Sequence, residues 1–179
     1  MLFLFGTQWA MGQNYLEHVN QGNTYYDSLD YASAAESYKS AAGLNEEGFE
    51  AQFNLGDVYF KQENFEEAAV AFETSLNLTE DKLTKAEVYF NLGNTYVRQK
   101  EYEKALDAYK KSLRYNPKDH EARYNLARLR KMLYEEAREN GDNNNDQDKK
   151  KNEPTEFALA LKKQCDELVE EFKFKEAYD

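Results

Sequence analysis

The stretch that decides the fold is AEVYFNLGNTYVRQKEYEKALDAYKKSLRYNPKD, which runs from Ala86 to Asp119. Gly93 and Ala105 are small residues that fall where two helices must approach each other closely. Tyr96 and Tyr109 are large aromatic residues that fall where the space between two helices must be filled. The spacing therefore predicts a helix–turn–helix unit of about 34 residues.

The same pattern of small and aromatic residues recurs twice upstream. Gly56 corresponds to Gly93 at a displacement of 37 residues, and Gly22 corresponds to Gly56 at a displacement of 34 residues. The extra three residues between the second and third copies fit a longer turn near Asp81 to Lys85. Three copies are about the minimum that can bury a continuous core.

This unit resembles the tetratricopeptide repeat (TPR), whose pattern reads L-G-x-x-Y, then A-x-x-x-F, then P. Leu92-Gly93, Tyr96, Ala105 and Pro117 agree with that pattern, and Tyr89 stands where the family has Trp. The resemblance implies an all-α fold, a right-handed α-solenoid of three TPR repeats with a capping helix, a linker and a C-terminal helical segment. The expected repeat helices are Tyr15–Ser28, Tyr31–Leu44, Phe49–Gln62, Phe65–Leu78, Lys85–Gln99 and Tyr102–Tyr115.

The predicted organisation begins with an N-terminal signal. Residues 1–12 resemble the remnant of a secretory signal peptide, because a short apolar run precedes the small-x-small sequence Ala10-Met11-Gly12. The alternative is an apolar helix packed on the first repeat. The remaining predicted segments are TPR 1 at 15–48, TPR 2 at 49–82, TPR 3 at 86–119, a capping helix at 120–139, a disordered polar linker at 140–154, and a helix with the start of a further repeat at 155–179.

Composition excludes several classes of function. The formal net charge is −11, with acidic residues spread along the chain, so the clustered basic face of a nucleic-acid-binding protein is not expected. The N-terminal apolar run is too short to span a bilayer directly. If it is a signal, it predicts an exported, periplasmic protein, and the alternative location is the cytoplasm.

Catalytic and metal-binding patterns are not recognised. The only two histidines, His18 and His120, have no triad or ligand spacing with Cys165, the single cysteine. The chain carries no phosphate-binding Gly-Lys-Ser/Thr loop and no Gly-x-Ser-x-Gly elbow. The Asn- and Asp-rich stretch at 140–154 lacks the Gly and Glu spacing of a calcium loop. We therefore expect no enzyme, no cofactor and no metal.

In the family that the chain resembles, the first helix of each repeat lines a concave groove that holds a protein or peptide segment. Asn54, Asn91 and Asn125 carry amide groups that suit the backbone of such a segment. The equally weighted alternative is that each Asn side chain forms hydrogen bonds with the backbone of the neighbouring repeat. The predicted peptide-binding groove comprises Asn23, Tyr26, Phe53, Asn54, Phe60, Phe90, Asn91, Asn94, Arg98, Tyr124, Asn125 and Arg128. The same family positions also fall on Val19, Asp27, Asp57, Lys61 and Val97.

One subtype of TPR domain clamps the C-terminal carboxylate of a chaperone with two Asn and three basic residues. Asn23 and Asn54 match the two Asn positions. Val19, Glu87 and Asn91 stand at the three basic positions, so a terminal carboxylate would be poorly paired. The sequence therefore excludes this clamp.

A closer resemblance rests on the order of the segments. A predicted signal, TPR units with YFNLGN at Tyr89–Asn94, the helix RYNLARLRKML at Arg123–Leu133 and a polar linker are similar to the exported TPR proteins of the bacterial aerotolerance (Bat) operon. The similarity spans Gln13 to about Lys151. It implies a non-catalytic scaffold in a complex with membrane proteins that carry von Willebrand A-type domains. Two alternatives stay open: an interaction module of a longer protein whose C-terminal part carries activity, and a self-associating TPR protein.

Overall fold

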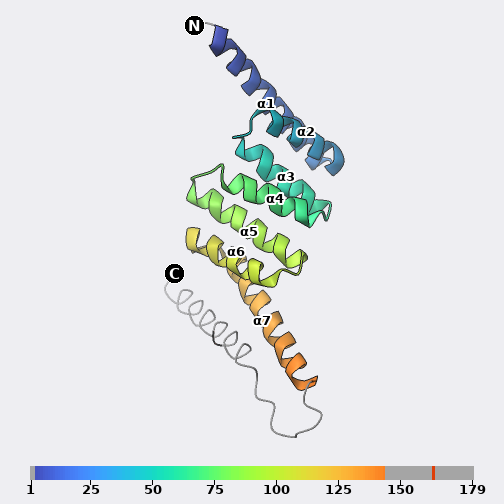
Figure 1. Cartoon of the computed structure of the whole chain (residues 1–179), viewed down its shortest axis with the longest axis vertical. Coiled ribbons are helices and arrows are strands. Elements are labelled where there is room, and N and C mark those ends of the chain that lie inside the picture. Colours follow the sequence, from blue (N-terminus) through green and yellow to red (C-terminus); the bar gives the residue numbers. More distant parts are fainter. Residues whose placement is uncertain (1–2, 144–162, 164–179) are drawn as a thin grey trace. The chain divides into compact units, whose positions relative to one another are not determined.

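A computed structural model describes the backbone of residues 3–143 and 163, and the side chains of residues 14–136 and 163. Every helix or strand within these residues is an α-helix, which confirms the all-α repeat fold. The chain divides after Lys118 into two compact units, and each unit is described by itself. The helices are α1 (Phe3–Asp27), α2 (Tyr31–Leu44), α3 (Phe49–Lys61), α4 (Phe65–Leu76), α5 (Lys82–Arg98), α6 (Tyr102–Tyr115) and α7 (His120–Asn143) (Figure 1).

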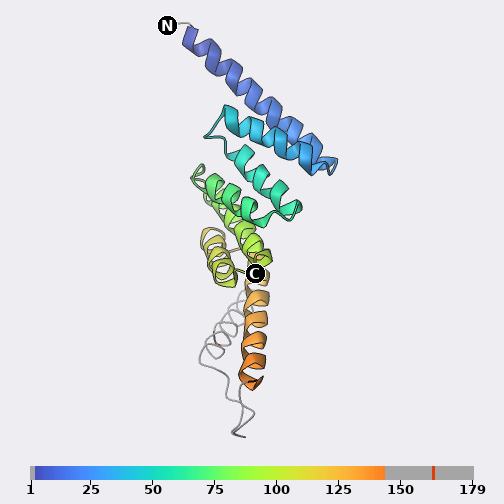
Figure 2. The ribbon, with the colours of Figure 1, turned by 45° about the vertical axis from the view of Figure 1, so that its right-hand side comes forward.

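The first unit is a stack of three helical hairpins. α1 packs on α2, α3 on α4 and α5 on α6, and the hairpins join through contacts of α2 with α3 and of α4 with α5. Figure 2 shows the successive hairpins from a second direction. α3 also contacts both α1 and α5, so the first helices of the three repeats are neighbours.

Close approach of the two helices within each repeat depends on glycine. A Cβ atom at Gly93 would lie 2.5 Å from Cε1 of Tyr109, which is far inside van der Waals contact. The aromatic ring of the second helix thus occupies the space that a side chain on the first helix would need. The equivalent pairs are Gly22 with Tyr38 and Gly56 with Phe72.

The turn inside each repeat contains one residue in the left-handed region. Leu29, Glu63 and Lys100 all have φ of 63°. The backbone N–H that follows then reaches back to the helix, as when Glu101 N donates a 2.8 Å hydrogen bond to Tyr96 O. This bond satisfies a carbonyl at the helix end, in the manner of a Schellman motif. The repeated turn sets the same reversal of direction in all three repeats.

Some helices begin or end at other residues than expected. α2 and α6 have the predicted bounds, whereas α5 begins at Lys82 and not at Lys85. The reason is an N-cap, because Oδ2 of Asp81 accepts a 2.8 Å hydrogen bond from the backbone N–H of Thr84. α1 begins at Phe3 and not at Tyr15, and no proline stands between these residues to end the helix.

The structure also corrects one groove position. Val19 is 7% exposed and packs with Tyr15, Ala41 and Ala51. It therefore belongs to the core of the first repeat, because α1 turns this side chain towards α2 and α3.

In the second unit, α7 has one apolar face. Ala122, Leu126 and Leu129 are buried and recur at helical spacing. α7 extends to Asn143, past the expected end of the capping helix, and its role as a cap stays a prediction. The rest of the predicted linker (144–154) and the predicted C-terminal segment (155–179, apart from residue 163) lie outside the described residues. None of the described helices has the length and apolar character needed to cross a bilayer.

Candidate functional site

Two amide bridges connect the first helices of neighbouring repeats. Nδ2 of Asn54 on α3 donates a 3.2 Å hydrogen bond to Oδ1 of Asn23 on α1. Nδ2 of Asn91 on α5 donates a 3.3 Å hydrogen bond to Oδ1 of Asp57 on α3. Both acceptors are side chains and not the backbone of the neighbouring repeat. Each bridge uses one donor of its amide, and an amide has two N–H donors and a carbonyl oxygen.

The second helices contribute hydroxyl groups to the same surface. The hydroxyl of Tyr38 on α2 donates a 2.7 Å hydrogen bond to Oδ1 of Asn23. The hydroxyl of Tyr109 on α6 donates an equivalent 2.7 Å bond to Oδ1 of Asn94. Sequence reasoning assigned Tyr109 only to the packing between two helices and gave its hydroxyl no role. The sequence does distinguish Tyr38 and Tyr109 from the second repeat, because Phe72 at the corresponding position has no hydroxyl.

The predicted groove phenylalanines lie at the border between the surface and the core. The ring of Phe53 stacks on Phe49 at a centroid distance of 5.3 Å and meets Phe72 edge-on at 5.7 Å. The ring of Phe90 lies 6.1 Å from that of Tyr109. Phe53 and Phe90 are half-buried, so each presents part of its ring to solvent.

Arg98 and Phe60 take part in a cluster between the second and third repeats. Nη2 of Arg98 lies 2.9 Å from Oε1 of Glu63, and its guanidinium lies 4.6 Å from the ring centroid of Phe65. The same guanidinium is 6.0 Å from the centroid of Phe60. This arrangement combines an ion pair with cation–π contacts and fastens α5 to the turn between α3 and α4. The cluster gives both residues a role in joining repeats.

The remaining predicted groove residues belong to α1 and α7. The ring of Tyr26 meets Tyr31 edge-on at a centroid distance of 5.5 Å. Tyr124 is 67% exposed, Asn125 is half-buried and Arg128 is exposed, all on α7. Because these three belong to the second unit, their place in the groove stays a prediction. We call the surface of α1, α3 and α5 the groove face; its residues are Asn23, Tyr26, Phe53, Asn54, Phe60, Phe90, Asn91, Asn94 and Arg98.

A cavity of about 310 Å³ opens on the groove face. Burial raises the pKa of Asp57 in its wall to about 6, the negative charge of Glu87 adds to this shift, and Lys61 opposes it. Negative charge in the cavity is thus only partly compensated. The lining consists of Asn23, Tyr26, Asp27, Tyr38, Asn54 and Asp57.

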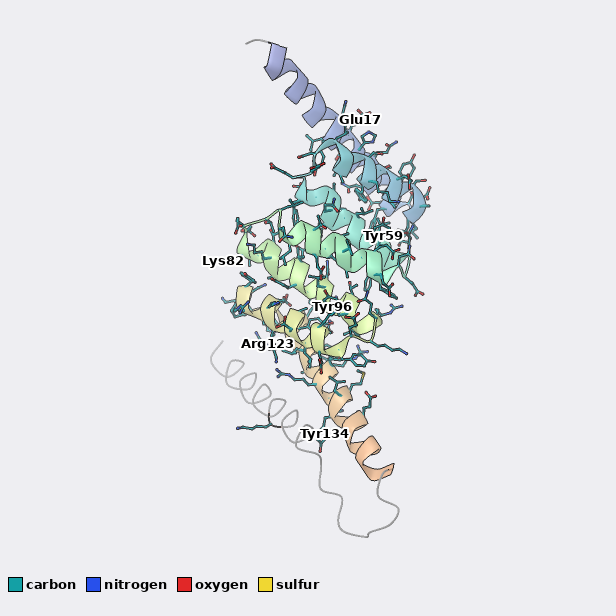
Figure 3. All side chains as sticks on the ribbon, viewed as in Figure 1. Glu17, Tyr59, Lys82, Tyr96, Arg123 and Tyr134 are labelled. Carbon is teal, nitrogen blue, oxygen red and sulfur yellow. The ribbon has the colours of Figure 1, made fainter. Side chains whose placement is uncertain are left out.

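Two larger hollows lie elsewhere on the repeats, and each has a charged wall residue that is already paired or hydrogen-bonded. One of about 640 Å³ includes Tyr59 and Lys39, and Lys39 pairs with Glu36 at 3.2 Å. Another of about 510 Å³ includes Tyr96, whose hydroxyl donates to Glu73. Figure 3 labels Tyr59 and Tyr96, which occupy equivalent positions of α3 and α5. In the part of the chain that the structure describes, no three His, Cys, Asp or Glu side chains gather to hold a metal ion.

Comparison with known families identifies the repeats. Three models described as tetratricopeptide repeat match residues 19–77, 49–118 and 108–151. Together they cover residues 19–151, so the chain belongs to the tetratricopeptide repeat family. No curated protein sequence matches this chain.

Solved structures share the fold. The first TPR domain of Spaghetti (RPAP3), bound to the HSP90 peptide SRMEEVD, has a TM-score of 0.63 at 21% identity, over 68% of this chain and 94% of that domain. The N-terminal domain of stress-induced protein-1 from C. elegans has a TM-score of 0.61 at 23% identity, over 67% and 97%. MamA has a TM-score of 0.65 at 22% identity, over 94% and 85%. At these identities the likenesses show the fold alone.

Proposed function

We propose that this chain is a non-catalytic scaffold that holds a segment of another protein against its groove face. The observation that carries the proposal is the continuity of that face. Amide bridges run from α1 to α3 and from α3 to α5, and half-buried aromatic rings lie beside them. Amides offer hydrogen bonds to the backbone of an extended segment, and the rings offer apolar contact.

The peptide complexes of two similar domains support this proposal. Besides the HSP90 peptide on the first RPAP3 domain, the second TPR domain of human RPAP3 was solved with the HSP70 peptide SGPTIEEVD. The HSP90 and HSP70 peptides are ligands of the RPAP3 domains. What carries over to this chain is the use of the repeat surface to hold an extended segment.

Site-specific cross-linking in the native host tests the proposal. A photo-reactive amino acid replaces exposed Lys61 on α3, and in a control it replaces exposed Val70 on α4. We expect one protein to be cross-linked from Lys61 and not from Val70, with the attached peptide identified by mass spectrometry. Cross-linking from Val70 alone would place the interaction surface outside the groove face.

We further propose an exported, periplasmic setting, in a membrane-associated complex of the aerotolerance type. This rests on the sequence of residues 1–12 and on the order of segments up to Lys151. A fusion of the full chain to alkaline phosphatase, which is active only after export, tests the location. We expect activity that is lost when residues 1–12 are removed. Activity confined to a cytoplasmic reporter would contradict export.

A further inference from the structure

The cavity on the groove face offers a negative and polar wall. Two carboxylates (Asp27 and Asp57), two amides (Asn23 and Asn54) and two tyrosines make up its described lining, and no Lys or Arg is among these residues. Its volume of about 310 Å³ is roughly ten times the volume that one water molecule occupies in the liquid. A side chain of another protein can therefore enter.

The second repeat differs from the other two repeats at the position of Asp57. In the first and third repeats, the residue after the glycine is an Asn whose Oδ1 accepts a hydrogen bond from a tyrosine hydroxyl. In the second repeat that residue is Asp57, and the ring facing Gly56 is Phe72. Asp57 thus places a carboxyl group at a position where the internal hydroxyl donor of the other repeats is replaced by an apolar ring. Oδ1 of Asp57 accepts a 3.3 Å hydrogen bond from Nδ2 of Asn91.

The negative field extends across the cavity. Burial raises the pKa of Tyr38 to about 12, and the charges of Asp57 and Asp27 contribute to that shift. Burial also raises the pKa of Tyr26, again with contributions from Asp57 and Asp27. Lys61 of α3 acts in the opposite direction on Asp57, while Glu87 of α5 adds to the negative field. A cation that enters the cavity would compensate this negative charge.

We propose that the cavity between α1, α2 and α3 receives the guanidinium group of an arginine from the bound protein segment. Guanidinium is planar, pairs with carboxylates through parallel N–H donors, and stacks on aromatic rings. Asp57 and Asp27 supply the carboxylates, and the ring of Tyr26 supplies a face. Oδ1 of Asn54 accepts a further bond, whereas Oδ1 of Asn23 already accepts two, from Tyr38 and from Asn54. The compact ammonium group of lysine matches this planar arrangement less well.

This assignment rests on the proposed function and specifies the chemistry of the partner. The peptides bound by the two similar RPAP3 domains end in Glu-Glu-Val-Asp and are acidic there. In this chain Val19, Glu87 and Asn91 stand where a carboxylate clamp has basic residues. We therefore assign a basic segment to this groove, with an arginine as its anchor.

Binding of small arginine derivatives to the full chain tests the assignment. N-acetyl-arginine amide is titrated while the side-chain amide signals of Asn23 and Asn54 are followed by NMR. The neutral isostere N-acetyl-citrulline amide and N-acetyl-lysine amide are titrated in parallel. We expect saturable shifts with the arginine derivative, weaker binding of the lysine derivative and no saturable binding of the citrulline derivative.

Asp57→Asn is the decisive variant, because its Oδ1 can still accept the hydrogen bond of Asn91. We expect the affinity for the arginine derivative to fall about tenfold or more, as for loss of a hydrogen bond to a charged group. Glu66→Gln removes one negative charge from an exposed site on α4 and should leave the affinity unchanged. Thermal unfolding of each variant shows that it is folded.

Equal binding of the citrulline or lysine derivative, no saturable shift, or unchanged affinity in Asp57→Asn would overturn the assignment. Its failure is distinguishable from failure of the proposed function. If cross-linking from Lys61 still captures a partner while the arginine derivative does not bind, the groove binds a segment of other chemistry. If Lys61 captures nothing, the proposed function itself is wrong.

Discussion

The hydroxyl of Tyr109 donates a 2.7 Å hydrogen bond to Oδ1 of Asn94, and its ring fills the space beside Gly93. One side chain thus packs the repeat and also organises a polar atom of the groove face. The first repeat has the same relationship, and the second has Phe72 beside Asp57. Exchanging Tyr and Phe at this aromatic position therefore keeps the packed ring and changes the polar contact on the groove face.

Phe72→Tyr should give Asp57 the hydroxyl donor that the other repeats have. Because a hydrogen bond to a charged carboxylate favours its ionised form, we expect the pKa of Asp57 to fall. We expect the free energy of unfolding at pH 7.5 to rise by about 1 kcal/mol. Urea unfolding and an NMR titration of the carboxyl carbon measure both effects. Lower stability with an unchanged pKa would show that the hydroxyl does not reach the carboxylate.

Gly93→Ala should destabilise the third repeat. The added methyl group would lie 2.5 Å from the Tyr109 ring, and overpacking of this kind costs about 1–3 kcal/mol, which outweighs the better helix propensity of Ala. Gly43→Ala in α2 is the matched control, since nothing lies within 4 Å of its added Cβ. The control should gain up to about 1 kcal/mol. Equal effects of the two substitutions in urea unfolding would contradict the packing account.

Lys100→Gly should stabilise the chain. Lys100 has φ of 63°, a region that glycine adopts without the steric cost of a Cβ atom. We expect a gain of about 1 kcal/mol in the free energy of unfolding. Lys110→Gly, at an exposed position within α6, should instead cost about 1 kcal/mol. A loss in both variants would show that the turn is not strained at Lys100.

Asp57→Asn should change how stability depends on pH. Burial raises the pKa of Asp57 from its ordinary 3.8 to about 6, so the folded protein holds this proton more tightly than the unfolded chain. The associated stability is fully present below pH 3.8 and is lost as the pH rises through about 6. We expect the variant to be more stable than the wild type at pH 7.5, by on the order of 1–3 kcal/mol. That difference should shrink towards pH 4.

Urea unfolding at the two pH values measures this difference. Glu66→Gln, at an exposed position, is the control for a general change in net charge. A stability difference between Asp57→Asn and the wild type that is the same at pH 4 and pH 7.5 would show that Asp57 does not titrate in this range.

The fold could be predicted from the sequence because its main determinants recur at fixed spacing. Gly56 and Gly93 mark close helix approach, and the repeated pattern outweighed the replacement of the family's Trp by Tyr89. The starts of α2, α3, α4 and α6 were predicted, whereas the start of α5 was not, because it depends on one hydrogen bond of Asp81. The extension of α1 to Phe3 carried no periodic signal.

The candidate site could be predicted only in part. Family positions identify which side of a first helix faces outward, but they do not say which side chains meet across repeats. The bond between Asn54 and Asn23 depends on how α3 packs beside α1. The pairing of Arg98 with Glu63 depends on the turn that brings Glu63 to α5. Such contacts require the packed repeats, because the partners lie more than 30 residues apart in sequence.

The most direct test of the groove-face scaffold is the affinity of the segment captured from Lys61. Its dissociation constant is measured by calorimetry for the wild type, for Asn54→Ala/Asn91→Ala, and for the control Asn77→Ala at the exposed end of α4. The scaffold account predicts an affinity at least about tenfold weaker for the double variant and unchanged affinity for the control. Equal affinity of all three folded proteins would contradict it and place the binding surface elsewhere.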